Sequence, residues 1–245
     1  MSIDWTPRPE FRWLIVAAVA KEIEPLVRDR APVSNAGGWP RFELDDSIGA
    51  VICGVGRANA AGAVATALAT ASKSDGDPFA LVLNVGVAGA LPGGGLAVGD
   101  LIVATESVFF EEGLDLPTGA VDMNGLGFPL AEGDWIDGNR ITPDASLVDA
   151  LVARLPGGVR RDAIATVARC SGTDRAAREV VKQTRAVAEA MEGAASSLIA
   201  RRFGVHAAEL RVISNTCGDR ERQSWDLSAA LKKLHAILPP LLHHE

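Results

Sequence analysis

The sequence predicts a single α/β domain, 1–245, in which helices cover both faces of a central mixed, largely parallel β-sheet. Two observations support this three-layer α/β/α arrangement. Continuous runs of Val, Ile, Leu and Ala alternate with amphipathic runs along the chain, which is typical of strands buried on both faces. The 245 residues, 48% of them hydrophobic and 22% charged, are enough to bury one sizeable core.

The elements follow from these runs in chain order. Strands are expected over 13–20, 79–91, 100–110, 162–170, 186–191 and 207–214, with a hairpin-like pair over 41–46 and 49–56. Helices are expected over 21–29, 58–71, 144–155, 174–183, 192–203 and 226–238, the third of them capped by Asp144. The strand over 79–91 is expected to run into a glycine turn. Residues 111–140, rich in Gly, Asp and Pro, are expected to form a long, functional loop.

Composition and charge exclude several classes of protein. A net charge of −7 argues against a nucleic acid or an anionic membrane as partner, because both require basic patches. Cys53, Cys170 and Cys217 are far apart in sequence, which favours reduced thiols in the cytoplasm over disulfides or a zinc site. The apolar run 13–20 is too short to span a membrane. We therefore expect a soluble, cytoplasmic protein without a metal.

A dinucleotide cofactor is the first alternative that the motifs raise. Gly54 and Gly56 stand between a strand and a helix, as in a dinucleotide fingerprint. However, Asn59 and Ala60 occupy the region of the third glycine, and no acidic residue ends a strand at the required distance. A tight strand–helix turn explains these glycines better, so no cofactor is expected.

Two strands deliver unusual residues to their carboxyl ends, where ligands bind in open parallel sheets. The stretch VISNTCGD, 212–219, begins as a buried strand and then places the amide of Asn215 at its end. The stretch NVGVAGAL, 84–91, packs glycines and small residues after a buried strand. This second stretch is compatible with a packing turn and equally with a backbone surface that a ligand approaches closely.

Two glutamates are candidates for catalysis. Glu192 stands between a strand ending at Met191 and a helix of small, apolar residues, so it is expected to be buried. A buried carboxylate needs hydrogen-bond donors, and the two hydroxyls of a ribose supply them. Glu22 follows the first strand, and in isolation it is predicted to be a solvated helix carboxylate like Glu24.

Four segments in this order resemble the purine nucleoside phosphorylase and nucleosidase superfamily: AAVAKEIEPL, LNVGVAGAL, AEAMEGAA and LRVISNTCGDR. The methylthioadenosine/S-adenosylhomocysteine nucleosidases have a Glu after the first strand, a Gly-Ser-Ala-Gly turn, a Met-Glu pair and an Arg-x-Ile-Ser-Asp segment. Here Val87 replaces the Ser of that turn and Asn215 replaces the Asp. The variant MEGAA, and ISN…GDR followed by Trp225 and Asp226, are similar to the futalosine hydrolases of the menaquinone pathway.

The resemblance implies a nucleoside phosphorylase-like fold, a homo-oligomer and a nucleoside substrate, with hydrolysis of futalosine to hypoxanthine and dehypoxanthine futalosine. It implies that Glu22 activates water with help from Arg211, that Glu192 holds the ribose hydroxyls, and that Asn215 contacts the base. It further implies substrate contacts from Gly86, Val87, Ala88, Thr173, Asp174, Met191 and Trp225. Arg220, Arg222 or a neighbouring subunit would pair with a carboxylate on the 5′ arm.

The identity of the base and of the nucleophile are separate questions. An amide at position 215 suits a 6-oxopurine, because it has an N–H group for O6, whereas a protonated Asp suits adenine. A carboxylate at position 22 suits water and repels phosphate, although Arg57 is a cation nearby in sequence. An adenine-releasing nucleosidase, a phosphorylase and a non-catalytic nucleoside-binding protein remain as alternatives.

Overall fold

The computed structural model describes residues 3–71 and 78–243. Its strands are β1 (Arg12–Ala17), β2 (Arg41–Glu43), β3 (Ile48–Ile52), β4 (Phe79–Ala90), β5 (Leu101–Phe109), β6 (Leu114–Leu116), β7 (Gly119–Val121), β8 (Ile136–Asp137), β9 (Arg140–Ile141), β10 (Arg160–Thr166), β11 (Ala188–Ala190) and β12 (His206–Thr216). Its α-helices are α1 (Glu24–Val27), α2 (Arg57–Ala71), α3 (Ala145–Ala153), α4 (Asp174–Thr184), α5 (Gly193–Arg202) and α6 (Leu227–Leu242), and its 3₁₀ helices are η1 (Ala20–Glu22), η2 (Ala36–Gly38) and η3 (Arg220–Arg222).

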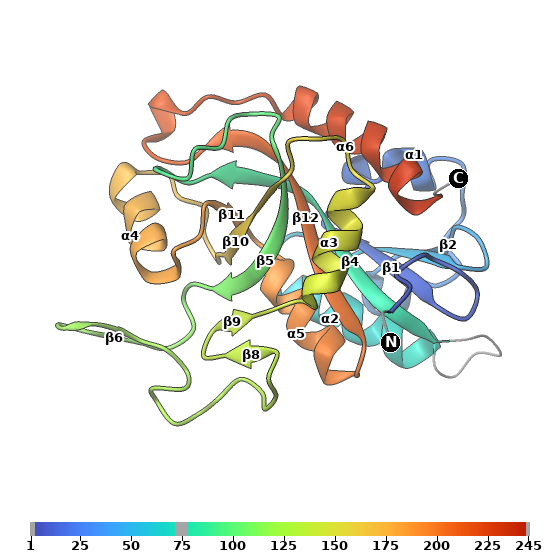
Figure 1. The fold of residues 1–245 in the computed structure, drawn as a ribbon, viewed down its shortest axis with the longest axis horizontal. Coiled ribbons are helices and arrows are strands. Elements are labelled where there is room, and N and C mark those ends of the chain that lie inside the picture. The colour runs from blue at the N-terminus through green and yellow to red at the C-terminus, as the bar shows by residue number, and fades with distance from the viewer. Residues whose placement is uncertain (1–2, 72–77, 244–245) are drawn as a thin grey trace.

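Ten strands form one mixed sheet at the centre of the molecule (Figure 1). The order is β2-β3-β1-β4-β11-β10-β5-β9-β8, and β12 pairs in parallel with β4 and antiparallel with β5. The predicted α/β fold with a mixed sheet is therefore confirmed. Because β4, β11, β10, β5 and β12 each pair with the next, they also close into a ring, which the sequence did not predict.

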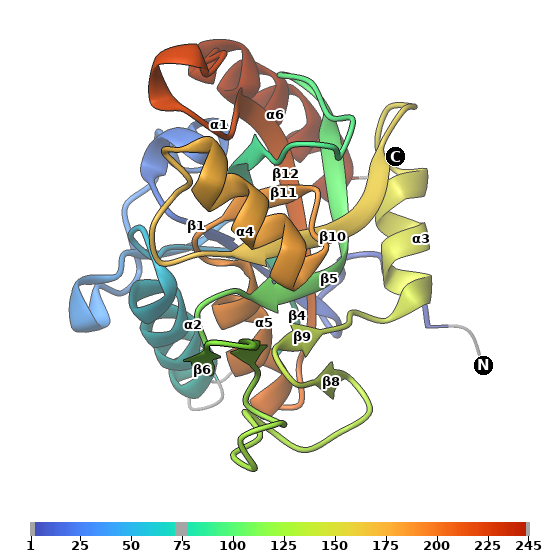
Figure 2. The ribbon, with the colours of Figure 1, turned by 90° about the vertical axis from the view of Figure 1, so that its left-hand side faces the viewer.

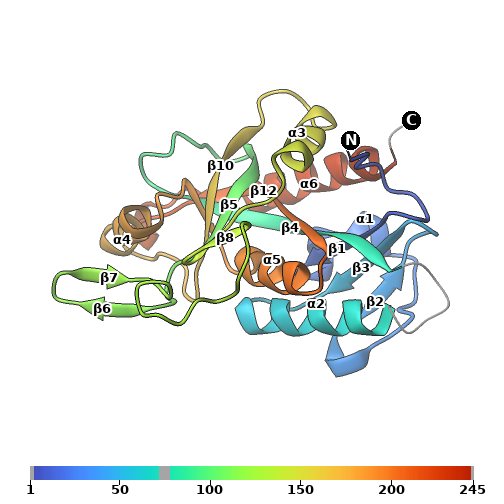
Figure 3. The ribbon, with the colours of Figure 1, turned by 60° about the horizontal axis from the view of Figure 1, so that its bottom comes forward.

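Helices cover both sides of the sheet. In Figure 2, α4 lies across the end of the ring formed by β10 and β11, and in Figure 3 α2 and α5 lie on one side of the sheet with α3 and α6 on the other. The side chains of β1 alternate between these layers, because successive residues of a strand face opposite ways. Trp13, Ile15 and Ala17 join one core cluster, and Leu14 and Val16 join the other.

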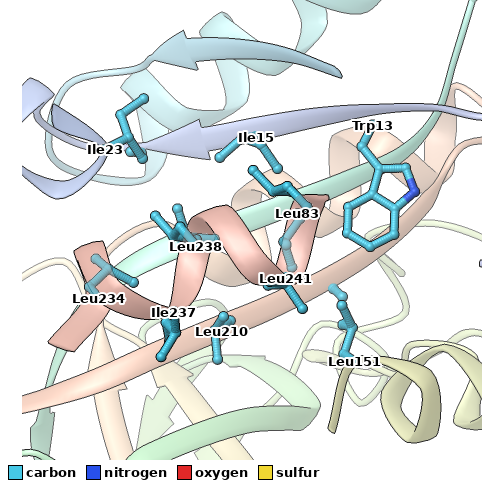
Figure 4. Close-up of a cluster of buried hydrophobic side chains, with 14 of the residues drawn as sticks. Trp13, Ile15, Ile23, Leu83, Leu151, Leu210, Leu234, Ile237, Leu238 and Leu241 are labelled. Carbon is cyan, nitrogen blue, oxygen red and sulfur yellow. The ribbon is translucent and has the colours of Figure 1, made fainter. Parts of the chain in front are cut away.

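The core under α6 is the larger of these two clusters. Leu234, Ile237, Leu238 and Leu241 point from one side of α6 towards strands β1, β4 and β12, where they meet residues such as Leu83 (Figure 4). Burying aliphatic side chains of this size stabilises the fold by about 1.5–3 kcal/mol each. This packing holds the carboxyl ends of β1, β4 and β12 in fixed positions.

Several predicted elements differ from the structure. Residues 111–140 are not a featureless loop, because they contain the hairpins β6–β7 and β8–β9. The β6–β7 hairpin projects away from the body of the molecule (Figures 1 and 3). The strand predicted over 79–91 is confirmed as β4, so Gly86 and Gly89 lie within a strand and not in a turn. The predicted helix 21–29 divides into η1 and α1, because Pro25 fits only the first turn of a helix.

The cap predicted at Asp144 is also corrected. Asp144 occupies the N-cap position of α3, yet its side chain makes no cap hydrogen bond. Its carboxylate lies 2.8 Å from Nδ1 of His206 and accepts a hydrogen bond from Arg201. The side chain therefore joins α3 to β12 and α5 instead of closing its own helix.

Within 3–71 and 78–243, no helix combines the length and apolar character that crossing a membrane requires.

Candidate active site

Glu22 is buried beneath the end of β1, contrary to the prediction of a solvated carboxylate. Only 5% of the residue is exposed. Oε2 accepts hydrogen bonds from the backbone N–H groups of Ala18 and Val19, and Oε1 accepts one from the N–H of Val87. The short η1 helix turns the side chain back to these donors. Glu24, by contrast, is part-exposed and pairs with Arg28 on the helix surface.

Arg211 is the buried cation of the site. It lies opposite Gly86 in the parallel β12–β4 ladder and is 1% exposed. Nε donates to Glu209 at 2.9 Å, and Nη2 donates to Oδ1 of Asn84. Nη1 lies beside Gly86, 2.5 Å from the position that a Cβ there would take. These two partners fix the plane of the guanidinium and leave one of its edges for a further acceptor.

Gly86 is where Glu22 and Arg211 meet. A Cβ on Gly86 would lie 2.5 Å from Nη1 of Arg211 and closer still to Oε1 of Glu22. Real Cβ atoms essentially never approach other atoms within 3.0 Å, so the absence of a side chain on Gly86 is what lets Glu22 and Arg211 lie this close to β4. A carboxylate and a guanidinium held close together are suited to orient a water molecule and take its proton.

Glu192 lies on the other side of Arg211, at the N-cap of α5. It is 5% exposed, and Oε1 accepts a hydrogen bond from the N–H of Gly56 at 2.9 Å. Oε2 lies 3.7 Å from Nη2 of Arg211. Burial in this position confirms that Glu192 is no surface cap. It connects the Gly54–Gly56 turn to the site.

Asn215 lies farther along β12, opposite Gly89 of β4. The β12–β4 register shifts between Ile213 and Asn215, so Ser214 is an extra residue in the ladder. Such a bulge re-aims the following side chain. The hydroxyl of Ser214 donates to Oδ1 of Asn215 at 2.9 Å, which leaves Nδ2 3.0 Å from the position of a Cβ on Gly89. The amide therefore turns its N–H side towards β4.

Two loops are joined beside Asn215. The first residue of α4 and the loop after β12 are joined by reciprocal hydrogen bonds, because the N–H of Asp174 donates to the side chain of Asp219 and the N–H of Asp219 donates to the side chain of Asp174. Thr173 caps α4 through its hydroxyl. Trp225 is 49% exposed, pairs through its backbone with Asn215, and lies under the guanidinium of Arg220. The sequence-predicted residues of both loops thus lie at one end of the site.

The other arginines considered for the site are engaged by neighbouring residues. Arg57, at the first residue of α2, pairs with Glu111 at 3.3 Å and with Glu112 at 3.1 Å. Arg222 pairs with both Asp174 and Asp219. Neither side chain is therefore an unpaired cation. Arg220 instead stacks on Trp225, with its ring centroid 4.4 Å away, and donates to Gln223.

Electrostatics at the site follow from burial. Burial raises the pKa of Glu22 and outweighs Arg211 and the backbone donors, which lower it. Burial lowers the pKa of Arg211, but the carboxylates of Glu209, Glu192 and Glu22 outweigh it, so the net shift is upward. Burial, reinforced by Glu192, raises the pKa of Cys53 to about 12, so its thiol stays protonated. Glu22 is thus a stronger base than an exposed glutamate.

Three buried polar residues of the site were not predicted from the sequence. Asn84 and Glu209 hold Arg211, and Glu189 accepts two hydrogen bonds from Ser171 at 2.7 and 2.6 Å. Each lies inside a strand read as a continuous apolar run, where a polar residue is unexpected unless it has a partner. That mismatch was the signal that could have revealed them.

Comparison with known proteins places this geometry in a family. Residues 13–242 match the family model described as the phosphorylase superfamily. A futalosine hydrolase of Streptomyces coelicolor is 34% identical over 231 residues, which cover 90% of this chain and 91% of that protein. A futalosine hydrolase of Thermus thermophilus is 34% identical over 78% of this chain and 80% of its own length. A third, from Acidothermus cellulolyticus, is 34% identical over 65% of this chain and 63% of its own length.

Solved structures show the same fold. A futalosine hydrolase mutant of Helicobacter pylori has a TM-score of 0.74 at 20% identity, covering 95% of this chain and 98% of that one. A methylthioadenosine/S-adenosylhomocysteine nucleosidase of Neisseria meningitidis has a TM-score of 0.73 at 22% identity, covering 94% and 98%. The chain belongs to the phosphorylase superfamily and, within it, to the futalosine hydrolase family.

Proposed function

We propose that this protein hydrolyses the N-glycosidic bond of futalosine, releasing hypoxanthine and dehypoxanthine futalosine in menaquinone biosynthesis. Two relatives that align over 80% and 91% of their own length are named futalosine hydrolases, which supports futalosine as the substrate. The observation that carries the proposal is the arrangement along β4. Glu22 and Arg211 both lie against Gly86, and the amide of Asn215 lies against Gly89. Arg211 and Asn215 lie on the same strand, β12, and both pair with β4 towards its carboxyl end.

The proposed chemistry follows the charges that develop in the reaction. Breaking the bond from the sugar C1′ to the purine N9 builds positive charge on the ribose and leaves the electron pair on the purine. Water attacks C1′ and gives its proton to Glu22, while Nη1 of Arg211 orients the attacking oxygen. The departing purine takes its proton from solvent. The raised pKa of Glu22 makes that carboxylate a better acceptor for the proton of water.

Asn215 supports the release of a 6-oxopurine. Its Oδ1 is occupied by the hydroxyl of Ser214, and Nδ2 donates to the carbonyl of Thr216, which leaves one N–H on the side of Gly89. That N–H pairs with the acceptors O6 and N7 of hypoxanthine. Adenine instead presents an amino donor at position 6, which would leave two donors facing one another.

The remaining predicted residues are proposed to complete the substrate contacts. Glu192 accepts hydrogen bonds from the ribose hydroxyls, with Met191 packed against the sugar. The β4 segment of Gly86, Val87 and Ala88 provides the backbone surface against which the nucleoside lies. Thr173, Asp174 and Trp225 lie on the loop pair at the Asn215 end, where they border the base and the 5′ arm.

Hydrolysis is favoured over phosphorolysis by the charges around Glu22. A phosphate needs a cationic clamp. Arg57, the cation that kept phosphorolysis open, is paired with Glu111 and Glu112. Arg211 is surrounded by Glu209, Glu192 and Glu22, so the site has more carboxylates than cations. This balance disfavours phosphate and suits a neutral water molecule.

The oligomeric state and the compartment are proposed on separate grounds. The projecting strand β6 exposes Leu114 and Leu116 on one face, and Phe128, which follows this hairpin in the chain, is 71% exposed. Apolar side chains gathered on a projection favour contact with a second copy, so we propose a homo-oligomer. Free thiols at Cys53, Cys170 and Cys217 fit the reducing cytoplasm. We also propose that residues 1–245 form one nucleosidase-like domain.

The direct test is release of free base from futalosine, followed by chromatography, with the wild-type protein and with Glu22→Gln. The proposal predicts hypoxanthine from the wild type and almost none from the variant. Adenine from an adenosine analogue, with futalosine untouched, would instead make the protein an adenine-releasing nucleosidase. Binding of futalosine without release of any base would make it a non-catalytic binding protein.

A further inference from the structure

Gly193 and Glu209 occupy the same small volume beneath the site. Gly193 is the first residue of α5, and Glu209 lies on β12 with no exposed surface. A Cβ on Gly193 would lie far inside 3.0 Å of the whole Glu209 carboxyl group. The backbone of Gly193 does not have the positive φ that favours glycine, so its conformation suits any residue. Position 193 therefore lacks a side chain for reasons of space.

The Glu209 carboxylate has no freedom to move out of the way. Oε1 accepts the hydrogen bond from Nε of Arg211 at 2.9 Å. Oε2 accepts a hydrogen bond from the hydroxyl of Ser107 at 2.5 Å. A buried carboxylate that gave up either partner would lose a charge-assisted hydrogen bond in a medium without water. The missing Cβ at position 193 is thus what allows the Glu209–Arg211 pair to exist.

The pair decides what Arg211 does in the site. With Nε held by Glu209 and Nη2 held by Asn84, only Nη1 remains for Glu22 and the space at Gly86. Without Glu209, the nearest anion for Arg211 is Glu192, whose Oε2 is 3.7 Å away. A guanidinium that closed on Glu192 would occupy the carboxylate proposed to hold the ribose. The guanidinium would also move away from Glu22.

We propose that Glu209 is a positioning residue for this hydrolysis. Its carboxylate neutralises Arg211 and orients the guanidinium through Nε, and the absence of a side chain on Gly193 provides the room for that carboxylate. The inference rests on the proposed function, since it assigns Glu209 a part in the same reaction. Neither residue contacts the substrate in this scheme. Their effect reaches the reacting atoms only through the position of the Arg211 guanidinium.

The first experiment separates positioning from general stability by kinetics. Glu209→Gln keeps the size of the side chain and removes its charge. It should lower kcat for futalosine by about tenfold or more with little change in KM. In an Arg211→Ala background the same substitution should change kcat less than twofold, because its target is gone. Asp149→Asn, which removes a carboxylate from the exposed pair with Arg161, is the matched control and should keep wild-type kcat.

The second experiment tests the shared volume without reference to activity. Gly193→Ala should lower the Tm, because its Cβ displaces the held carboxylate. Adding Glu209→Ala should raise the Tm above that of Gly193→Ala, since the space is then vacant. A double variant whose losses simply add would overturn the packing argument.

The outcomes distinguish this inference from the proposed function. A wild-type protein that releases no base from futalosine overturns the function and, with it, any part of Glu209 in turnover. A fully active wild type with an equally active, folded Glu209→Gln overturns the positioning role alone. Equal losses from Glu209→Gln in the presence and absence of Arg211 would also overturn it, because the effect would not pass through Arg211.

Discussion

Glu22 and Arg211 approach one another only where β4 has no side chain, at Gly86. Both are almost fully buried, and they come from η1 and β12, nearly two hundred residues apart in sequence. The carboxylate is held by three backbone N–H groups and the guanidinium by Glu209 and Asn84. The two groups are therefore fixed before a substrate arrives. Such preorganisation is what an enzyme needs to act on a water molecule at little further cost.

Gly86→Ala tests this relationship directly. The new Cβ would collide with Oε1 of Glu22 and Nη1 of Arg211, so one of them must leave its position. We expect the free energy of unfolding to fall by about 1–3 kcal/mol and kcat to fall about 100-fold. Thermal unfolding and base-release kinetics measure the two effects. Gly157→Ala, where a Cβ meets nothing within 4 Å, is the control. Normal turnover by Gly86→Ala would show that the space is not used.

Glu22→Gln should lose turnover and keep binding. The amide retains the size of the side chain but takes up no proton from water, so we expect kcat to fall by about 100- to 10,000-fold. Titration calorimetry with hypoxanthine should give a Kd close to that of the wild type. Glu24→Gln changes the neighbouring, part-exposed glutamate and should behave as the wild type. Equal turnover by Glu22→Gln would remove Glu22 from the mechanism.

The stability of the wild type depends on pH through Glu22, whereas that of Glu22→Gln does not. Because burial raises the pKa of Glu22 above its ordinary value of 4.5, the folded wild type is most favoured when Glu22 is protonated. Its contribution is fully present below pH 4.5 and is lost as the pH rises through the folded-state pKa. Glu22→Gln carries no such charge. The Tm of Glu22→Gln relative to that of the wild type should therefore rise as the pH rises from 4.5 towards neutral. A difference that grows in acid would contradict the raised pKa.

Asn215→Asp tests the choice of base. A carboxyl group at this position suits the amino group of adenine, whereas the present amide offers an N–H to O6. We expect the ratio of kcat/KM for futalosine to kcat/KM for aminodeoxyfutalosine to fall tenfold or more. The Ser214 hydroxyl still holds the oxygen of the new side chain, so the fold should be retained. Unchanged preference in an active variant would refute the role of the amide.

The fold was predictable because continuous apolar runs mark its strands and amphipathic runs between them mark its helices. The closure of the ring was not predictable, because β12 pairs with β4 and β5 through contacts distant in sequence. The end of α6 was also missed. The predicted helix stopped at Leu238 before two prolines, yet the structure continues to Leu242, and both Leu241 and Leu242 are buried. Burial of apolar side chains there outweighs the low helix propensity of proline.

The candidate site was partly predictable. Glu192 and Asn215 stand out in sequence, because polar residues there interrupt apolar or small-residue segments. Glu22 does not stand out, since only the fold brings Val87 and Arg211 to its carboxylate. The bulge at Ser214, which aims the amide, depends on the pairing of β12 with β4 and leaves no mark in local sequence.

The central claim is that this site delivers water, not phosphate, to a 6-oxopurine nucleoside. The most direct measurement is release of free base from futalosine, inosine, adenosine and methylthioadenosine, each with and without phosphate. The account predicts hypoxanthine from futalosine at a rate independent of phosphate, with inosine a poor substrate. Release that requires phosphate and yields a sugar phosphate would contradict the role of Glu22, and adenine as the preferred product would contradict the role of Asn215.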